Sequence, residues 1–147
     1  MERPSTTFYH AKEDGSGSAV RFSLFPATRA AEGHVKVEIA PQNKPGPAGG
    51  FPTFDWNDTV VTRLYKIGLS DVLRVLRGIV DAAEIVHVKE IHFRKLNTAA
   101  PEYELSVVHA KDETRRSVMF SFTEGEAFAL SVTLEQALFH VCFGKVK

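Results

Sequence analysis

The stretch FPTFDWNDTVVTRLYKIGLSDVLRVLRG, residues Phe51 to Gly78, changes periodicity halfway along and sets the pattern for the rest of the chain. Aromatic and β-branched side chains alternate with polar ones from Phe54 to Val61, which predicts a strand. Apolar residues then recur every three or four positions from Leu69 to Val80, which predicts a helix. Gly68 or Ser70 can start this helix, and the final glycine of the stretch is its expected stop.

A second strand and helix of the same kind follow later in the chain. Residues Arg115 to Phe122 have a strand pattern, and Thr123 to Gly144 have a helix pattern. Thr123 with Glu126 three residues later forms a capping box, which marks the start of that helix. The chain is therefore expected to form strands followed by one helix, twice, in an α+β fold whose halves cover about residues 6–80 and 81–145.

Several shorter stretches outside these two units alternate between apolar and polar residues, as strands do. Asp81 to Glu84 is expected to be a connection, and the loop Pro41 to Gly50, rich in proline and glycine, is expected to join two strands. The stretch Ile85 to Leu96 is long enough for one bent strand or two short ones. The other expected strands are Thr6 to His10, Ala19 to Phe25, His34 to Ala40 and Tyr103 to Ala110.

Composition places the chain among globular proteins with one domain, residues 1–147. Hydrophobic residues make up 44% and charged residues 24%, so the chain can bury a core. No apolar run is long enough to span a membrane, and the single cysteine, Cys142, cannot form an internal disulfide. With no signal or transit peptide in the sequence, we expect a cytoplasmic protein, which includes one bound to a nucleoid or made in a phage-infected cell. The 18 basic and 18 acidic residues exclude a uniformly positive surface but allow a local basic stripe.

Four strings in the same order resemble the Whirly family of single-stranded DNA-binding proteins over roughly residues 6–145. FDW at Phe54 to Trp56, with the helix after it, is similar to the aromatic-Asp-Trp strand and first helix of that family. GHVKVEIAP at Gly33 to Pro41 and YELSVVHAK at Tyr103 to Lys111 resemble two further strands, and the string at Thr123 to Gly144 resembles the C-terminal helix. A fainter likeness extends to PC4-like binders, mitochondrial RNA-binding proteins and phage single-strand binders.

The resemblance implies a (ββββα)x2 topology, with two antiparallel four-stranded sheets packed crosswise and helices that hold a homotetramer together. The plant proteins carry a lysine-glycine-lysine-alanine string between their first two strands. At that place this chain reads YHAKEDGSG, with Lys12 as its one lysine and with two acids. The role of the lysine-rich string is therefore not implied for this chain.

Binding of single strands without strong sequence preference needs cations along the phosphates and flat side chains that accept unstacked bases. Aromatic residues near strand ends and loops, and basic residues on strands, are the candidates. The alternatives are a packing role for each aromatic residue and a solvated sheet face for the basic ones. The candidate nucleic-acid-binding residues are Phe8, Tyr9, Lys12, Arg21, Lys36, Phe54, Trp56, Lys89, Arg94, Lys95, Tyr103 and Arg116.

The expected helix from Thr123 to Gly144 has two apolar stripes. One stripe can pack on the chain's own sheets. The second would leave three phenylalanines in water, which monomers rarely tolerate. The sequence therefore predicts self-association through the second stripe, and the resemblance implies a tetramer. The second stripe consists of Phe128, Val132, Phe139 and Phe143.

Three classes of function follow from the residues and the resemblance: single-stranded DNA binding, RNA binding by the same fold, and a structural or protein-interaction module. An enzyme is not expected, since the sequence contains no assembled catalytic motif and no phosphate-binding glycine loop. Neither a cofactor nor a metal is expected, because His87 and His92, five apart on a strand, would point to opposite faces. The expected ligand is single-stranded DNA, with RNA as the alternative, and no membrane is expected as a partner.

Overall fold

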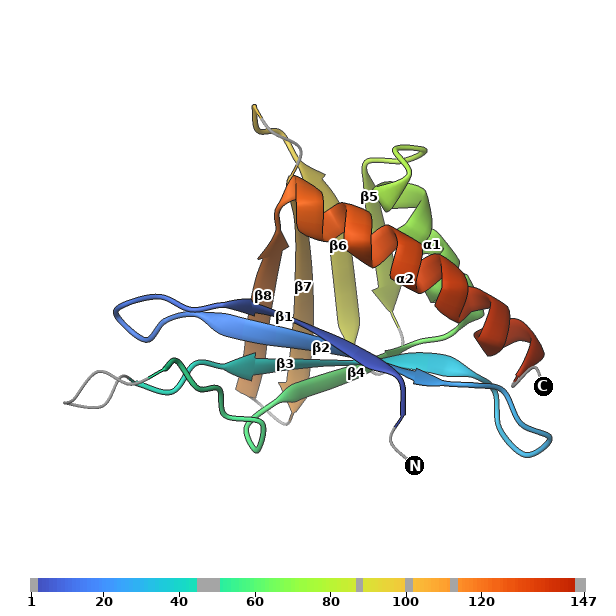
Figure 1. The fold of residues 1–147 in the computed structure, drawn as a ribbon, viewed down its shortest axis with the longest axis horizontal. Coiled ribbons are helices and arrows are strands. Elements are labelled where there is room, and N and C mark those ends of the chain that lie inside the picture. The colour runs from blue at the N-terminus through green and yellow to red at the C-terminus, as the bar shows by residue number, and fades with distance from the viewer. Residues whose placement is uncertain (1–2, 45–50, 87–88, 100–101, 112–113, 145–147) are drawn as a thin grey trace.

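Two antiparallel four-stranded sheets and two helices make up the described part of the computed structural model (Figure 1). The structure describes residues 3–44, 51–86, 89–99, 102–111 and 114–144. Each sheet keeps its strands in sequence order, and one helix follows each sheet. The strands of the first sheet run crosswise to those of the second (Figure 1). The expected α+β fold with two crossed sheets is therefore confirmed.

The first sheet consists of β1 (Ser5–His10), β2 (Ser18–Phe25), β3 (His34–Pro41) and β4 (Val60–Leu64). β2 pairs with β1 on one side and with β3 on the other, and β4 forms an edge. Alternate side chains point into the core and away from it, as the sequence pattern predicts. The inward-facing core residues of this sheet include Val20, Phe22, Val35, Val37, Ile39, Val60 and Leu64.

The segment that leads into β4 is not the strand that its alternation predicts. Phe54 makes a single bridge with Gln42, and the chain then turns. The carboxylate of Asp55 accepts a hydrogen bond from the backbone N–H of Asn57 at 3.0 Å, and its backbone carbonyl accepts one from Asp58 at 3.2 Å. These local bonds compete with a sheet ladder, so the paired strand begins only with β4.

Helix α1 (Lys66–Leu76) starts before both Gly68 and Ser70, the two positions expected to start it. Tyr65 precedes the helix in an extended conformation and provides no side-chain cap, so the capping signal sought in the sequence is absent here. Gly68 is buried inside the helix. The expected stop at Gly78 is confirmed, because this residue has a φ of 74°, which glycine adopts without strain.

The second sheet consists of β5 (Ala82–Val86), β6 (Glu90–Leu96), β7 (Glu102–Lys111) and β8 (Thr114–Phe122). The expected connection at Asp81 to Glu84 is wrong, because β5 begins at its second residue and packs alternate side chains against the core. Two strands, not one bent strand, cover the stretch 85–96. The inward face of this sheet supplies the large buried rings Phe93, Phe120 and Phe122.

Helix α2 (Glu124–Phe143) has the bounds that its pattern predicts. The capping box is confirmed: the hydroxyl of Thr123 accepts from the backbone N–H of Glu126 at 3.3 Å, and the carboxylate of Glu126 accepts from the backbone N–H of Thr123 at 3.0 Å. α2 contacts α1 and strands of both sheets, so it closes the core between them (Figure 1). Among the residues described, neither helix has the length and apolar character that a membrane crossing requires.

Candidate nucleic-acid interface

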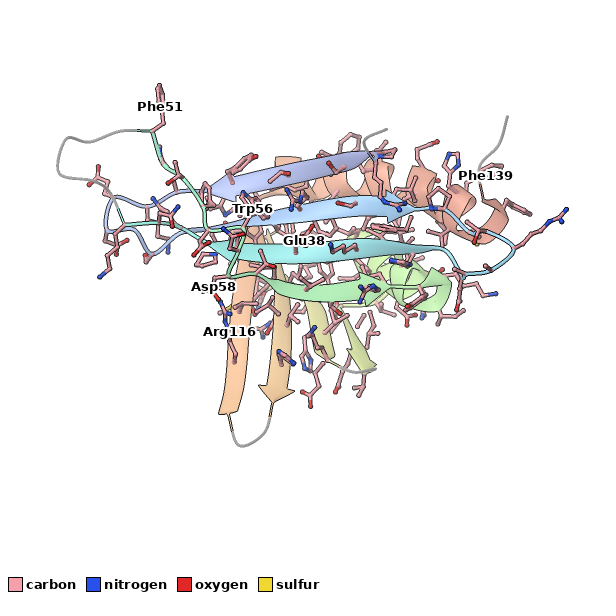
Figure 2. The ribbon with its side chains drawn as sticks, turned by 90° about the horizontal axis from the view of Figure 1, so that it is seen from below. Glu38, Phe51, Trp56, Asp58, Arg116 and Phe139 are labelled. Carbon is pink, nitrogen blue, oxygen red and sulfur yellow. The ribbon has the colours of Figure 1, made fainter. Side chains whose placement is uncertain are left out.

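The outer face of the first sheet, the side turned away from the core, carries charged and aromatic side chains, and Figure 2 looks onto it. Strand pairing sets Arg21 opposite Glu38, and Lys36 opposite Arg63. Since alternate residues of a strand share a face, these four side chains lie on the same side of the sheet. Glu38 is the one carboxylate within β1 to β4, against three long cationic side chains. This face therefore has an excess of positive charge.

Glu38 holds two of these cations in place. Its side chain is 11% exposed, and it accepts hydrogen bonds from Nε and Nη2 of Arg21 at 3.1 and 3.2 Å. The Nζ atom of Lys36 lies 3.8 Å from the same carboxylate. A carboxylate so little exposed needs partners of this kind, because burying an unpaired charge costs several kcal/mol. Arg21 and Lys36 are therefore positioned, while Arg63 is exposed beside them.

Three aromatic residues, Tyr9, Phe54 and Trp56, form the Tyr9 cluster at one end of this face. The ring centroids of Tyr9 and Phe54 are 5.4 Å apart, and Tyr9 is 58% exposed. The Cζ atom of Arg21 lies 4.2 Å from the centroid of the Trp56 ring, a cation–π contact. The turn before β4 thus brings two rings to the sheet beside its cations (Figure 2). Accessible rings next to cations are what stacking of an unpaired base requires.

Three further rings, Phe25, His34 and Tyr65, form the Phe25 cluster at the opposite end of the face. Phe25 and His34 are register partners, and their rings stack with centroids 4.7 Å apart and an interplanar angle of 13°. The ring centroid of Tyr65 lies 5.4 Å from that of His34, and the Cζ atom of Arg3 lies 3.9 Å from the centroid of the Phe25 ring. Sequence reasoning missed these residues, although strand alternation places Phe25 and His34 on the same face as the predicted cations.

Two basic groups near this face have lowered pKa values. Burial is the main cause that lowers the pKa of His34; the backbone of Glu32 opposes it, and the charges of Arg63 and Arg3 add to it. The His34 ring is therefore neutral at neutral pH, and it stacks as a flat, uncharged surface. Burial, and then the charge of Arg63, lowers the pKa of Lys89. The ammonium of Lys89 donates to a backbone carbonyl of β4, so this predicted residue lies at the edge of the sheet.

Two of the predicted aromatic residues point into the core. Phe8 contacts the rings of Phe22 and Phe122 edge-on, with centroids 6.2 and 5.5 Å apart. Tyr103 is 8% exposed, and its ring stacks with that of Phe93 at 6.0 Å. Their positions near strand ends indicated exposure, but each shares a strand face with buried apolar neighbours. Phe8 and Tyr103 are therefore not part of the accessible aromatic surface.

Besides Lys89, four predicted cations lie outside the first sheet's outer face, and three of these, Arg94, Lys95 and Arg116, are on strands of the second sheet. Arg94 projects from the outer face of the second sheet, where its Nε and Nη2 atoms donate to Glu104 at 3.1 and 3.0 Å. Lys95 follows it and is exposed near the end of β6. The structure therefore does not bring Arg94 and Lys95 together with the Tyr9 cluster.

The other two cations border the Tyr9 cluster. Arg116 donates from Nη1 to the carboxylate of Asp58 at 2.9 Å, which ties β8 to the turn that carries Trp56 (Figure 2). Lys12 is exposed between β1 and β2, where its backbone N–H donates to the Gln42 side chain at 2.8 Å. Arg116 is paired with Asp58, and Lys12 lies beside Glu13 and Asp14, so neither residue adds net positive charge at that end of the sheet.

The second apolar stripe of α2 lies on the molecular surface. Phe128 and Phe143 are 73% and 74% exposed, and Val132 and Phe139 are exposed as well. Glu135 lies beside this stripe and forms an ion pair with Arg77, the residue that follows α1. The pair neutralises the charge of Glu135 at the margin of the apolar strip.

No protein-family model and no curated protein matches this sequence. In structure, the chain is similar to the Trypanosoma proteins MRP1/MRP2, with a TM-score of 0.75 and 17% identity over 98% of this chain and 90% of that chain. It is also similar to a guide-RNA-binding protein complex bound to a gRNA, with a TM-score of 0.72 and 19% identity over 94% of this chain and 91% of that one. A further similar structure is WHY1 from Arabidopsis thaliana, with a TM-score of 0.72 and 15% identity over 96% of this chain and 86% of that one. The chain therefore has the Whirly-like fold.

Proposed function

We propose that this chain binds single-stranded nucleic acid on the outer face of the first sheet, with DNA as its natural ligand and with little preference for sequence. The observation that carries the proposal is the Tyr9 cluster beside Arg21 and Lys36. Every base has a flat face, so rings of this kind accept bases of any sequence, while the cations contact the phosphates.

The same geometry disfavours a duplex. In double-stranded DNA the faces of the bases are already stacked on one another, so the Tyr9 cluster cannot reach them. Only the phosphate contacts remain, and these carry no selectivity for single strands. We therefore expect the aromatic side chains to supply the preference for single strands and the cations to supply the salt dependence.

RNA is the second candidate ligand, because one of the similar structures is a complex bound to a gRNA. Stacking rings and phosphate-binding cations accept either kind of strand. The group that lets a protein distinguish RNA from DNA is the 2′-hydroxyl. A direct comparison of DNA and RNA of one sequence therefore decides between the two ligands.

Fluorescence anisotropy with end-labelled oligonucleotides of about 30 nucleotides tests the proposal. We expect tighter binding to single-stranded DNA than to RNA of the same sequence or to the matching duplex. The plot of log affinity against log salt should fall by about 0.7 for each phosphate neutralised. Tighter binding to RNA would assign the site to RNA, and equal affinity for duplex and single strand would contradict the proposal.

We further propose that the second stripe of α2 joins copies of this chain into a homotetramer. The exposed residues of the stripe run from Phe128 to Phe143 along a helix of 20 residues, which is about 30 Å long. Exposed apolar strips of this size are unusual on monomers. Around a four-fold axis the strips of the four copies would meet, apolar surface against apolar surface, with the Arg77–Glu135 pair at the border of each strip.

The substitution Phe139→Glu tests this assembly. A charge at the centre of the strip should split the tetramer and leave the strands folded, because Phe139 does not contribute to the core. Thr133→Glu places the same charge at an exposed position of α2 outside the strip and should leave the assembly intact. Light scattering and circular dichroism measure the two effects. A monomeric unmutated protein at micromolar concentration would rule the assembly out.

A further inference from the structure

We infer that the Phe25 cluster is a second base-stacking subsite, which takes another part of the same single strand that the Tyr9 cluster binds. The inference rests on the proposed function, since it extends that ligand across the same face. Phe25 lies on β2, His34 lies opposite it on β3, and Tyr65 directly follows β4. The three rings therefore form a row across the sheet, at the end away from Tyr9.

Both clusters have the same arrangement of an arginine on an aromatic ring. Arg3 lies on Phe25 at 3.9 Å and Arg21 lies on Trp56 at 4.2 Å, each measured from Cζ to the ring centroid. An exposed cation–π contact is weaker than the stacking of a base on the same ring. A base can therefore displace Arg3 from Phe25, and the released guanidinium can then pair with a phosphate.

A hollow on the sheet surface lies between Phe25 and the cations. It is shallow and open, with a volume of about 390 Å³. Phe25, His34 and Tyr65 each remain partly exposed, so packing within the chain covers the cluster only in part. The residues that line the hollow include Arg3, Arg21, Ser23, Phe25, Lys36 and Glu38.

The spacing of the two clusters suits one continuous strand. Tyr9 is the register partner of Ala19, and Phe25 lies six positions further along β2 (25 − 19 = 6). At about 3.3 Å per residue this is about 20 Å, which a stacked strand covers with about six nucleotides at about 3.4 Å each. Arg21 and Lys36 lie between the clusters, where the phosphates of that strand would pass.

A length series of oligo(dT), from about 4 to about 16 nucleotides, tests the inference by anisotropy. For the unmutated protein we expect a second rise in affinity once the strand is longer than about six nucleotides. Phe25→Leu removes the ring but keeps an apolar side chain, and it should weaken binding about tenfold for the longer strands only. Tyr9→Leu should weaken binding at every length. Met119→Leu, at an exposed position of the second sheet, is the matched control and should change nothing.

Photo-crosslinking of the unmutated protein to strands that contain 5-iodouracil gives a second readout that does not depend on a variant. We expect cross-links to Phe25, His34 or Tyr65 only with the longer strands. If Phe25→Leu does not fold, Tyr65→Leu takes its place in the length series. Full affinity of the variant at all lengths, without cross-links to the three rings, would overturn the inference and leave the proposed function standing. Failure of the unmutated protein to bind any strand would overturn both.

Discussion

The outer faces of the two sheets share one architecture and differ in chemistry. Each is one side of four antiparallel strands in sequence order. The first presents three long cationic side chains around one carboxylate, with a cluster of rings at each end. The second, at the outward positions whose side chains the structure describes, presents no phenylalanine, tyrosine or tryptophan, and Arg94 is the one arginine among them. The glutamates at these outward positions are Glu84, Glu90, Glu102 and Glu104.

This difference shows that a net charge of zero does not describe the charge of either face. The 18 basic and 18 acidic residues cancel over the whole chain, yet they do not cancel on each face. Composition alone therefore lowers the expectation of nucleic-acid binding, whereas alternation along the strands separates a positive face from a negative one. On the proposed function, we therefore expect a nucleic-acid strand to be attracted to the first sheet and repelled by the second.

Of the changes that test the difference between the two faces, charge reversal on the first sheet should lower the affinity for single strands the most. The double variant Lys36→Glu, Arg63→Glu should weaken single-strand binding by at least about a hundredfold, and the salt slope should fall by about 1.4 if each residue contacts one phosphate. Arg94→Glu, Lys95→Glu makes the same change of charge on the second sheet and should leave affinity nearly unchanged. Equal losses in the two double variants would show that total charge, and not the face, governs binding.

Removal of one ring should have a smaller effect. Trp56→Ala should weaken binding by about 1–3 kcal/mol, the usual contribution of one stacked base, in an anisotropy titration. Arg94→Ala is the control on the other face and should change affinity little. Trp56 is only partly buried, so its loss should destabilise the fold by less than the roughly 3–5 kcal/mol of a core aromatic residue. A thermal melt that shows the full core penalty would assign Trp56 to packing.

The smallest effect should come from the titration of His34. Its pKa is lowered in the folded chain, chiefly by burial, so the unfolded chain binds more protons as the pH falls below about 6.5. The stability that neutral His34 provides is complete above that pH and declines as the pH falls toward the folded pKa. His34→Phe should therefore flatten the decline of the melting temperature between about pH 7 and pH 5. If the melting temperatures of the unmutated protein and of His34→Phe fall in parallel with pH, the titration of His34 does not cause the decline.

The elements with the strongest patterns could be predicted from the sequence. α2 has its expected bounds because the Thr123–Glu126 capping box and Gly144 mark both ends. The turn at Asp55 to Asp58 was missed, because aromatic alternation there outweighed the tendency of aspartate and asparagine to bond to their own backbone. The start of α1 was missed because no side chain caps it.

The choice of face could not be predicted from the sequence alone. Basic residues occur on strands of both sheets, and only the register shows that Arg94 is opposite Glu104 while Lys36 is opposite Arg63. The Phe25 cluster depends on a contact with Tyr65, which lies far from Phe25 in sequence. Such contacts follow from strand pairing, so they become visible only once the sheet is assembled.

The position of Trp56 also gives the protein an intrinsic optical signal. It is the only tryptophan in the chain, and a guanidinium group lies on its indole ring. Indole emission responds to a nearby charge and is quenched by a stacked base. Any ligand that displaces Arg21 from the indole ring, or that stacks on the ring, therefore changes the emission of Trp56. With excitation selective for tryptophan, occupancy of the first sheet can then be followed in unlabelled protein.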